Sequence, residues 1–302
     1  MVTIWLRKKR ICRNIASQSA LIMQNEQQIG TDSDFLIDID RVIAAKAPGL
    51  NKTFRRILGA YLKRIVHQED INKFIIAKRD VKGIEYAKVI IEKFGANVSI
   101  YGLENVPDEG RFVFASNHPL GGLDGMAFIH AVGLKFRNLK FPVNDILLYV
   151  RNFSEIFLPV NKVGTTSRHA AELMEEAFRS DCQMLMFPAG LCSRKRNGRI
   201  VDLEWKKGFV TKAIETQRDI IPVYISGRNS NFFYNLSNLR TRLGIKVNIE
   251  MLFLVDEMYK QHGRHLDVYF GRPIQWQSLE GENPRAAAQK IKNVVYALRN
   301  NE

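Results

Sequence analysis

The sequence is poor in cysteine. Its three cysteines, Cys12, Cys182 and Cys192, show neither the spacing of a zinc site nor the even number expected of a disulfide framework. Free thiols are typical of a reducing compartment, which favours the cytosolic side of a membrane. Cys192 stands near basic residues, which could lower its pKa and make it reactive; the alternative is an inert free thiol.

Long hydrophobic runs are also missing. No uncharged stretch approaches the ~18 residues that a membrane-spanning helix needs. Residues 1–30 lack the unbroken apolar core of a signal peptide. We expect them to be an N-terminal extension that is either disordered or mis-started, with translation beginning at Met23 instead of Met1.

Several catalytic and binding motifs are absent. The chain has no GxSxG elbow and no cysteine arranged with a histidine, which argues against a covalent serine or cysteine intermediate. No spacing of His, Cys, Asp or Glu indicates a metal site. Zinc fingers, a Walker loop and an RNP-like aromatic strand are missing too, which argues against nucleic acid.

Acidic residues are outnumbered. Lysine and arginine total 45 against 31 aspartates and glutamates, so the formal net charge is +14. Such a surface attracts nucleic acid, an anionic bilayer or acidic small substrates. We favour an anionic membrane surface and expect no nucleic acid; a basic nucleic-acid-binding protein is the principal alternative.

Residues 31–95 are predicted to be helical. The clearest helix lies near residues 50–67, where apolar side chains recur every three or four positions and cations surround them. This pattern suits a helix that lies among the headgroups of an anionic membrane. The alternative is a helix that packs on the core with a solvated basic face. The apolar stripe consists of Phe54, Ile57, Leu58, Tyr61, Leu62 and Ile65.

From about residue 96, short apolar strands alternate with helices. This alternation predicts an α/β fold with a mostly parallel central sheet flanked by helices. Binding sites in such sheets form where loops leave the carboxyl ends of strands. The expected strands are 97–102, 112–116, 139–143, 156–160, 184–187, 220–225 and 266–270, and the expected helices lie near 124–136, 166–179, 204–217, 231–243 and 284–300.

The first segment with chemistry follows the strand 112–116. It reads Asn-His-Pro-Leu-Gly-Gly-Leu-Asp and places His118 at a strand end and Asp124 at the start of the next helix. A carboxylate beside an imidazole fixes its tautomer and stabilises the imidazolium that forms when it takes up a proton. The pair predicts a general base for a hydroxyl group; the alternative is a structural loop with a capping aspartate.

Three further segments follow apolar strands. The residues 187–193, Phe-Pro-Ala-Gly-Leu-Cys-Ser, lead into a run of cations that suits a phosphate or carboxylate, or is simply a solvated basic loop. The residues 157–162, Phe-Leu-Pro-Val-Asn-Lys, precede Arg168, and 221–223 read Ile-Pro-Val. We expect Lys162, Arg168 and Arg194 to hold an anionic group of the substrate.

These four segments, in this order, resemble the motifs of the glycerolipid (lysophospholipid) acyltransferase superfamily. The resemblance covers roughly residues 97–230, and the N-terminal basic helices are similar to the membrane-docking helices of bacterial members. It implies catalysis by His118 and Asp124. It also implies substrate binding by Asn117, Gly121, Gly122, Lys162, Arg168, Pro188, Ala189, Gly190, Ser193 and Arg194.

The chain departs from the superfamily pattern at three points. Five residues instead of four separate His118 from Asp124, and Gly121 and Gly122 lie in that gap. Glycines can absorb the extra residue by adopting a positive φ. Ala189 replaces the usual glutamate and Lys162 the usual arginine. These departures resemble the branch of bacterial ornithine- and glycine-lipid O-acyltransferases and of chains labelled hemolysin-like.

The resemblance implies an O-acyltransferase of lipid metabolism that moves a fatty acyl group from acyl carrier protein or coenzyme A to the hydroxyl of a lyso-lipid. It implies no cofactor beyond that donor and a peripheral place on the cytoplasmic side of the inner membrane. Residues 31–95 would be the membrane-docking region and 96–302 the acyltransferase domain. The alternatives are a lysophosphatidic acid acyltransferase of phospholipid biosynthesis, a lysolipase and an inactive lipid-binding relative.

Overall fold

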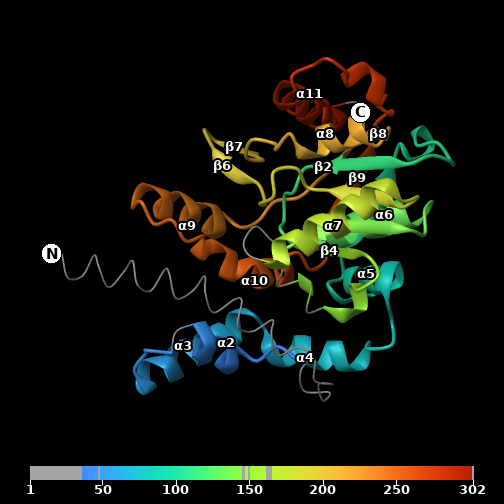
Figure 1. The fold of residues 1–302 in the computed structure, drawn as a ribbon. Helices are drawn as coiled ribbons and strands as arrows, with labels where there is room; N and C mark the ends of the chain where they lie inside the picture. Colours follow the sequence, from blue (N-terminus) through green and yellow to red (C-terminus); the bar gives the residue numbers. More distant parts are fainter. Residues whose placement is uncertain (1–35, 47, 145–146, 149, 161–164, 301–302) are drawn as a thin grey trace. The chain divides into compact units, whose positions relative to one another are not determined.

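The computed structural model describes residues 36–300 apart from 47, 145–146, 149 and 161–164 (Figure 1). The expectations for residues 1–30 and for Lys162 lie outside the described part. The chain forms two compact units, Met1–Ala77 with Lys162–Thr166, and Lys78–Asn161 with Ser167–Glu302. The helical region expected over 31–95 is therefore divided between them.

The first unit contains the helices α2 (Ile39–Lys46), α3 (Lys52–Ile65) and α4 (Gln68–Ala77). The helix expected near residues 50–67 is confirmed as α3. The Asn51 side chain caps it by accepting a hydrogen bond from the Thr53 amide at 2.8 Å. Only part of its apolar stripe is covered, because Ile65 is buried while more than half of the surface of Phe54, Ile57 and Tyr61 is exposed.

The second unit is built on a seven-stranded sheet in the order β1-β9-β8-β2-β5-β3-β4. All neighbouring pairs are parallel except β8 with β9. The predicted strands and the mostly parallel α/β class are confirmed. The bounds are β1 (Asn97–Tyr101), β2 (Phe112–Ser116), β3 (Leu139–Val143), β4 (Phe157–Pro159), β5 (Gln183–Met186), β8 (Asp219–Ile225) and β9 (His265–Phe270).

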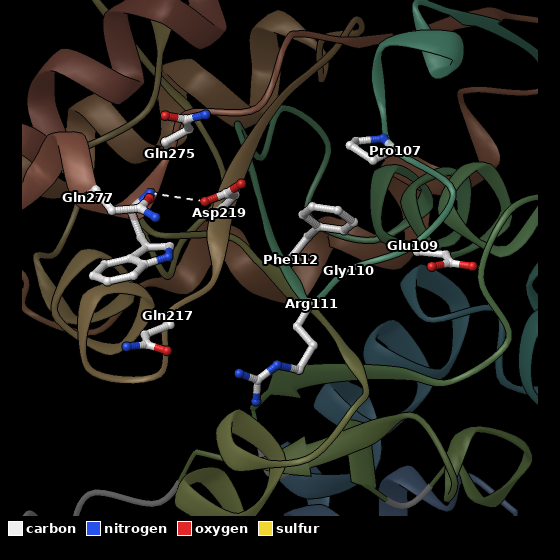
Figure 2. A pocket seen from close by; sticks show the side chains of 10 residues that line it. Pro107, Glu109, Gly110, Arg111, Phe112, Gln217, Asp219, Gln275 and Gln277 are labelled. Atoms are coloured by element: carbon white, nitrogen blue, oxygen red, sulfur yellow. Dashed lines mark hydrogen bonds between the residues drawn. The ribbon is translucent and has the colours of Figure 1, made fainter.

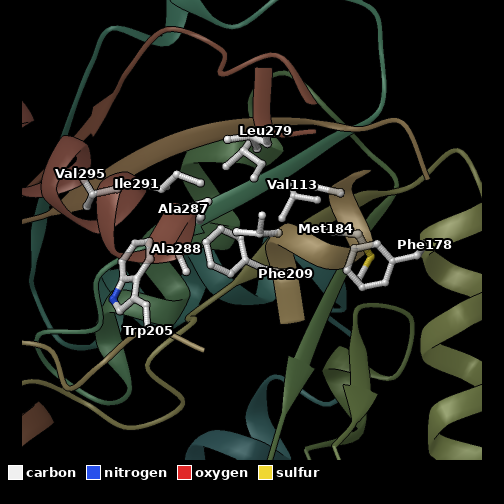
Figure 3. Close-up of a cluster of buried hydrophobic side chains, with 14 of the residues drawn as sticks. Val113, Phe178, Met184, Trp205, Phe209, Leu279, Ala287, Ala288, Ile291 and Val295 are labelled. Atoms are coloured by element: carbon white, nitrogen blue, oxygen red, sulfur yellow. The ribbon is translucent and has the colours of Figure 1, made fainter. Parts of the chain in front are cut away.

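Strand β2 lies in the centre, and its five residues are all buried. Strands covered by helices on both faces are apolar throughout, as β2 is. On one face, Val113 and Ala115 pack with Phe209 and Ile291 in the cluster shown in Figure 3. On the other face, the Phe114 ring contacts other aromatic rings, including Phe136 at 6.0 Å between centroids.

The helices of the second unit are close to those expected from the sequence. The predicted helix 204–217 begins later, at Gly208, because the residues before it pack as a loop around the buried side chain of Trp205. The bounds are α5 (Gly83–Lys93), α6 (Leu123–Gly133), α7 (Thr165–Arg179), α8 (Gly208–Glu215), α9 (Asn231–Arg242) and α11 (Pro284–Ala297).

Some elements were not predicted. The basic run after residue 193 forms an antiparallel hairpin of β6 (Arg194–Arg196) and β7 (Arg199–Val201). The 3-10 helix η5 (Ile249–Phe253) and the helix α10 (Leu254–Tyr259) follow α9. Among the described residues, no helix combines the length and the apolar character needed to cross a bilayer.

Candidate active site

The predicted pair forms at the carboxyl end of β2. The Nδ1 atom of His118 lies 2.8 Å from the Oδ2 atom of Asp124. Asp124 sits in the first turn of α6, as expected, and its side chain is completely buried, whereas 17% of the His118 side chain remains exposed. The imidazole is thus held from inside the protein and reached from outside.

Backbone amides surround the Asp124 carboxylate. Besides His118, the amides of Leu120 and Gly121 donate to Oδ2, at 2.8 and 3.2 Å, and those of Gly122 and Gly125 donate to Oδ1, at 2.9 and 3.0 Å. The turn requires a φ of +83° at Gly121, which glycine adopts without strain. The extra residue in the loop is absorbed as predicted.

This cradle corrects one expectation. Gly121 and Gly122 were predicted to bind substrate, but their amides are already donated to Asp124. A side chain at either glycine would also collide with its neighbours, because a Cβ would lie 2.8 Å from Leu254 or 2.6 Å from Met258. The two glycines therefore position Asp124 instead of contacting substrate.

The cradle keeps Asp124 ionised. Burial by itself would raise the pKa of this carboxyl, but the attraction of His118 and the hydrogen bonds from the imidazole and the amides outweigh it, so the pKa lies below its ordinary value. An ionised carboxylate only accepts hydrogen bonds, so Nδ1 of His118 carries the proton. Nε2 is left as the nitrogen that can accept one.

Phe187 fixes the plane of the imidazole. Its ring stacks on His118 with the centroids 3.9 Å apart and the planes 18° apart. The Phe187 ring itself stacks on Phe128 of α6, at 5.6 Å. The sequence placed Phe187 in a motif but not in the site, since ring stacking across neighbouring strands leaves no local signal.

Asp202 is a site residue that the sequence reading missed. Its Oδ1 accepts from the Ser193 hydroxyl at 2.6 Å and from the His118 amide at 3.2 Å, and its Oδ2 accepts from the Trp205 indole at 2.9 Å. The Ser193 amide donates to the His118 carbonyl at 2.7 Å. Asp202 and Ser193 thus join the loop of His118 to the turn after β5. Ser193, expected to bind substrate, is buried and serves this connection.

Asn117 also has a structural role. It was predicted to contact substrate, but its side chain is buried and its amide group is occupied on both sides. The Nδ2 atom donates to the Ile225 carbonyl at 2.8 Å, and the Ile225 amide donates to Oδ1 at 2.7 Å. Asn117 therefore ties the end of β2 to the end of β8, where the two parallel strands would otherwise separate.

The turn after β5 contains three predicted residues. Gly190 is exposed with a φ of +69°, and its amide donates to the Phe187 carbonyl at 2.9 Å. The Pro188 carbonyl accepts from the Lys206 amide at 3.1 Å. Ala189 is buried in the core cluster, so its small side chain is matched to the packing there. Of these three, Gly190 is the residue that faces solvent beside the stacked ring of Phe187.

The three cations expected to hold an anion differ in their surroundings. Arg194 is buried, and its guanidinium donates to the Glu250 carboxylate at 2.9 Å, so its charge is already compensated. This corrects the expectation that Arg194 binds the acceptor. Arg168 lies on α7 with 88% of its side chain exposed and an ion pair to Glu172. Lys162 lies outside the described residues.

Cys192 is not a reactive thiol. Its side chain is fully buried, and burial raises the pKa of the thiol to about 11 despite the neighbouring Arg194. The basic residues near it in sequence suggested the opposite shift. The prediction failed because burial, which sequence proximity does not reveal, dominates the thiol's surroundings.

A separate polar pocket lies at the opposite edge of the sheet. It is lined by residues that precede β2 and begin β8, including Gly110, Arg111 and Asp219 (Figure 2). Five strand residues separate this edge from the loop of His118, which corresponds to roughly 17 Å. This pocket is therefore not part of the candidate site. In the described part of the chain, no group of His, Cys, Asp and Glu side chains could hold a metal ion.

Comparisons with known proteins agree with the geometry. A family model described as Acyltransferase matches residues 41–301. A lyso-glycine lipid O-acyltransferase of Bacteroides thetaiotaomicron is 45% identical over 269 residues, which are 88% of this chain and 99% of that protein. One of the same name from Phocaeicola vulgatus is 44% identical over 277 residues, covering 91% and 99%.

A more distant relative acts on a different lipid by its name. The 1-acyl-sn-glycerol-3-phosphate acyltransferase of Borreliella burgdorferi is 28% identical over 176 residues, which are 56% of this chain and 66% of that protein. The similarity to the two glycine-lipid enzymes is thus higher and extends over nearly their whole length.

Proposed function

This chain belongs to the acyltransferase family, and we propose that it transfers a fatty acyl group from an acyl thioester to the hydroxyl of a lyso-glycine lipid, with His118 as the general base. The acceptor is inferred from the names of the two relatives that match over nearly their full length. The chemistry is inferred from the His118–Asp124 pair.

The proposed reaction is a direct transfer. Nε2 of His118 removes the proton from the acceptor hydroxyl while the oxygen attacks the thioester carbonyl carbon. The C–S bond then breaks, and the leaving thiolate takes the proton from the imidazolium. The products are an ester of the lipid and the free thiol of acyl carrier protein or coenzyme A.

The observation that carries this proposal is the enclosure of Asp124. A carboxylate that accepts five hydrogen bonds stays negative and fixed, so it holds Nδ1–H and stabilises the imidazolium that the reaction creates. General-base assistance of this kind typically contributes about 10²–10⁴-fold to the rate. Asp124 acts through His118 and is a positioning residue.

The same proposal includes a place on the cytoplasmic face of the inner membrane. The exposed apolar side chains of α3, Phe54, Ile57 and Tyr61, alternate with cations, and the chain carries a net charge of +14. This combination supports peripheral binding to anionic lipid, where both the acceptor and an acylated donor are accessible.

The decisive experiment measures transfer of a labelled acyl group by purified protein to mono-acylated glycine lipid and, in parallel, to 1-acylglycerol-3-phosphate. We expect transfer to the glycine lipid and about 10²–10⁴-fold less activity in His118→Gln. The matched control is His265→Gln, which changes an exposed histidine that also contacts an aspartate, Asp267, at 3.0 Å.

Three outcomes would contradict the proposal. Full activity of His118→Gln removes the general base. Preference for 1-acylglycerol-3-phosphate replaces the acceptor by that of the distant relative. Release of free fatty acid without transfer turns the enzyme into a lysolipase.

A further inference from the structure

A second exposed apolar surface lies on the second unit. Five large apolar side chains within 14 residues of chain face solvent, and the exposed fractions reach 65% at Leu243 and 69% at Val247. They extend from the last turns of α9 through the following loop to η5. We call this the α9–η5 surface, and its members are Leu239, Leu243, Ile245, Val247 and Leu252.

The backbone beneath this surface is ordered. The Leu243 amide donates to the Leu239 carbonyl at 3.0 Å, and the Ile245 amide donates to the Arg240 carbonyl at 3.1 Å. The guanidinium of Arg240 in turn donates to the Ile245 carbonyl at 2.9 Å. The apolar side chains are therefore presented to solvent by a hydrogen-bonded turn, and this turn does not depend on burying them.

The charges around the surface are of one sign. Residues 228–249 include four cations, Arg228, Arg240, Arg242 and Lys246, and no aspartate or glutamate. The next acidic residue, Glu250, is fully buried and lies 2.9 Å from both Arg194 and Arg240. No carboxylate in this stretch opposes an anionic partner.

The surface is coupled to the proposed active site. The residues after η5 contact the catalytic turn, since Leu254 lies against Gly121 and Met258 against Gly122. The Arg194–Glu250 ion pair connects η5 to the strand that follows Ser193. A partner bound at the α9–η5 surface would thus lie against the segment that shapes the His118 loop.

We propose that the α9–η5 surface is a membrane contact of the second unit itself, with Leu243 and Val247 inserted among the lipids of an anionic bilayer. Apolar side chains that protrude between cations match both parts of such a bilayer, acyl chains and headgroups. An acidic carrier protein would be attracted by the cations, but it would leave five protruding apolar side chains to cover. The inference goes beyond the proposed function, because lipid binding needs neither His118 nor turnover.

The test uses the full chain and sedimentation with two kinds of vesicle, an equal mixture of phosphatidylglycerol and phosphatidylcholine, and phosphatidylcholine alone. We expect the double variant Leu243→Glu/Val247→Glu to bind the anionic vesicles about tenfold more weakly, because it places two charges where apolar groups insert. The matched control is Val294→Glu, which makes the same change at an exposed valine of α11.

Insertion is tested separately with a fluorophore on a single cysteine. Val247→Cys, made in a Cys12→Ser background and labelled with nitrobenzoxadiazole, should shift its emission to the blue when anionic vesicles are added. Val294→Cys should not. Cys182 and Cys192 are buried and do not compete for the label.

Each alternative occupant has its own result. Unchanged vesicle binding by the double variant, or no shift at Val247→Cys, would overturn the proposal. Unchanged vesicle binding with loss of activity only on acyl carrier protein thioesters would assign the surface to the carrier. A change from dimer to monomer in the double variant, again with unchanged vesicle binding, would assign it to a second copy. The activity of His118→Gln does not affect any of these outcomes.

Discussion

At the scale of single residues, the structure concentrates its hydrogen bonds on two aspartates. Asp124 accepts five and holds the imidazole of His118. Asp202 accepts from the His118 backbone, from Ser193 and from Trp205. One carboxylate thus orients the side chain of His118 and the other its main chain, and together they leave the histidine little freedom to turn.

We expect Asp124→Asn to lose about 10²–10⁴-fold in kcat, because the amide neither stabilises the imidazolium nor enforces the Nδ1–H tautomer. At neutral pH it should also unfold more easily, by about 1.5–3 kcal/mol, since it loses hydrogen bonds to a charge. Acyl-transfer kinetics and urea unfolding measure the two effects. Asp108→Asn, which changes a carboxylate with 92% of its side chain exposed, is the control and should alter neither.

The stability difference should depend on pH in a defined direction. The pKa of Asp124 in the folded protein lies below its ordinary value of 3.8, so the ionised form binds the folded state more favourably. Its contribution is complete above about pH 4 and is lost as the pH falls toward the lower, folded-state pKa. The gap between wild type and Asp124→Asn should narrow below pH 3.8 in urea titrations. A gap that widens there would contradict the role of the cradle.

At the scale of elements, a buried cation ends helix α7. The Arg218 side chain is fully buried, and its guanidinium donates to four carbonyls at the carboxyl end of that helix and just beyond it. These carbonyls have no partner within the helix, and they carry the negative end of its dipole. Arg218 therefore joins the start of β8 to the end of α7 and to the beginning of β5. The four carbonyls belong to Ala177, Phe178, Ser180 and Cys182.

We expect Arg218→Met to lower the free energy of unfolding by about 2–4 kcal/mol, because buried carbonyls lose their donors while the apolar volume is kept. Urea unfolding monitored by circular dichroism gives the value. The control is Arg179→Met in the last turn of the same helix, where 75% of the side chain is exposed. It should change stability by no more than about 0.5 kcal/mol. Equal effects of the two substitutions would contradict the role of Arg218.

At the scale of the whole molecule, charge and exposed apolar side chains act together. The net charge of +14 attracts the chain to an anionic surface over a distance of about 10 Å at 0.1 M salt and about 3 Å at 1 M salt. The exposed apolar side chains of α3 act at contact, and salt does not screen them. The two contributions can therefore be separated by ionic strength.

We expect binding to anionic vesicles to weaken at least about tenfold between 0.1 M and 1 M salt, because the Coulombic part is screened. The residual binding at 1 M salt should fall further in Ile57→Glu on α3 and stay unchanged in Leu134→Glu, an exposed leucine at the end of α6. Sedimentation with vesicles measures both. Binding that is indifferent to salt, or to the substitution on α3, would contradict the proposed membrane contact.

The sequence by itself determined the features that depend on near neighbours. The strands and helices follow from apolar periodicity, and the His118–Asp124 pair spans six residues that contain their own glycine turn. The direction of β9, which runs against β8, could not be predicted, because it depends on which strand edges remain after the others have paired.

Only the tertiary structure decided what the distant polar residues do. Asn117 pairs with Ile225, 108 positions away, and Arg194 with Glu250, 56 positions away, so neither is left to hold substrate. Asp202, 84 positions from His118, became part of the site without any local motif. The physical reason is burial: a buried polar group must find a partner, and packing of segments far apart in sequence determines which partner is within reach.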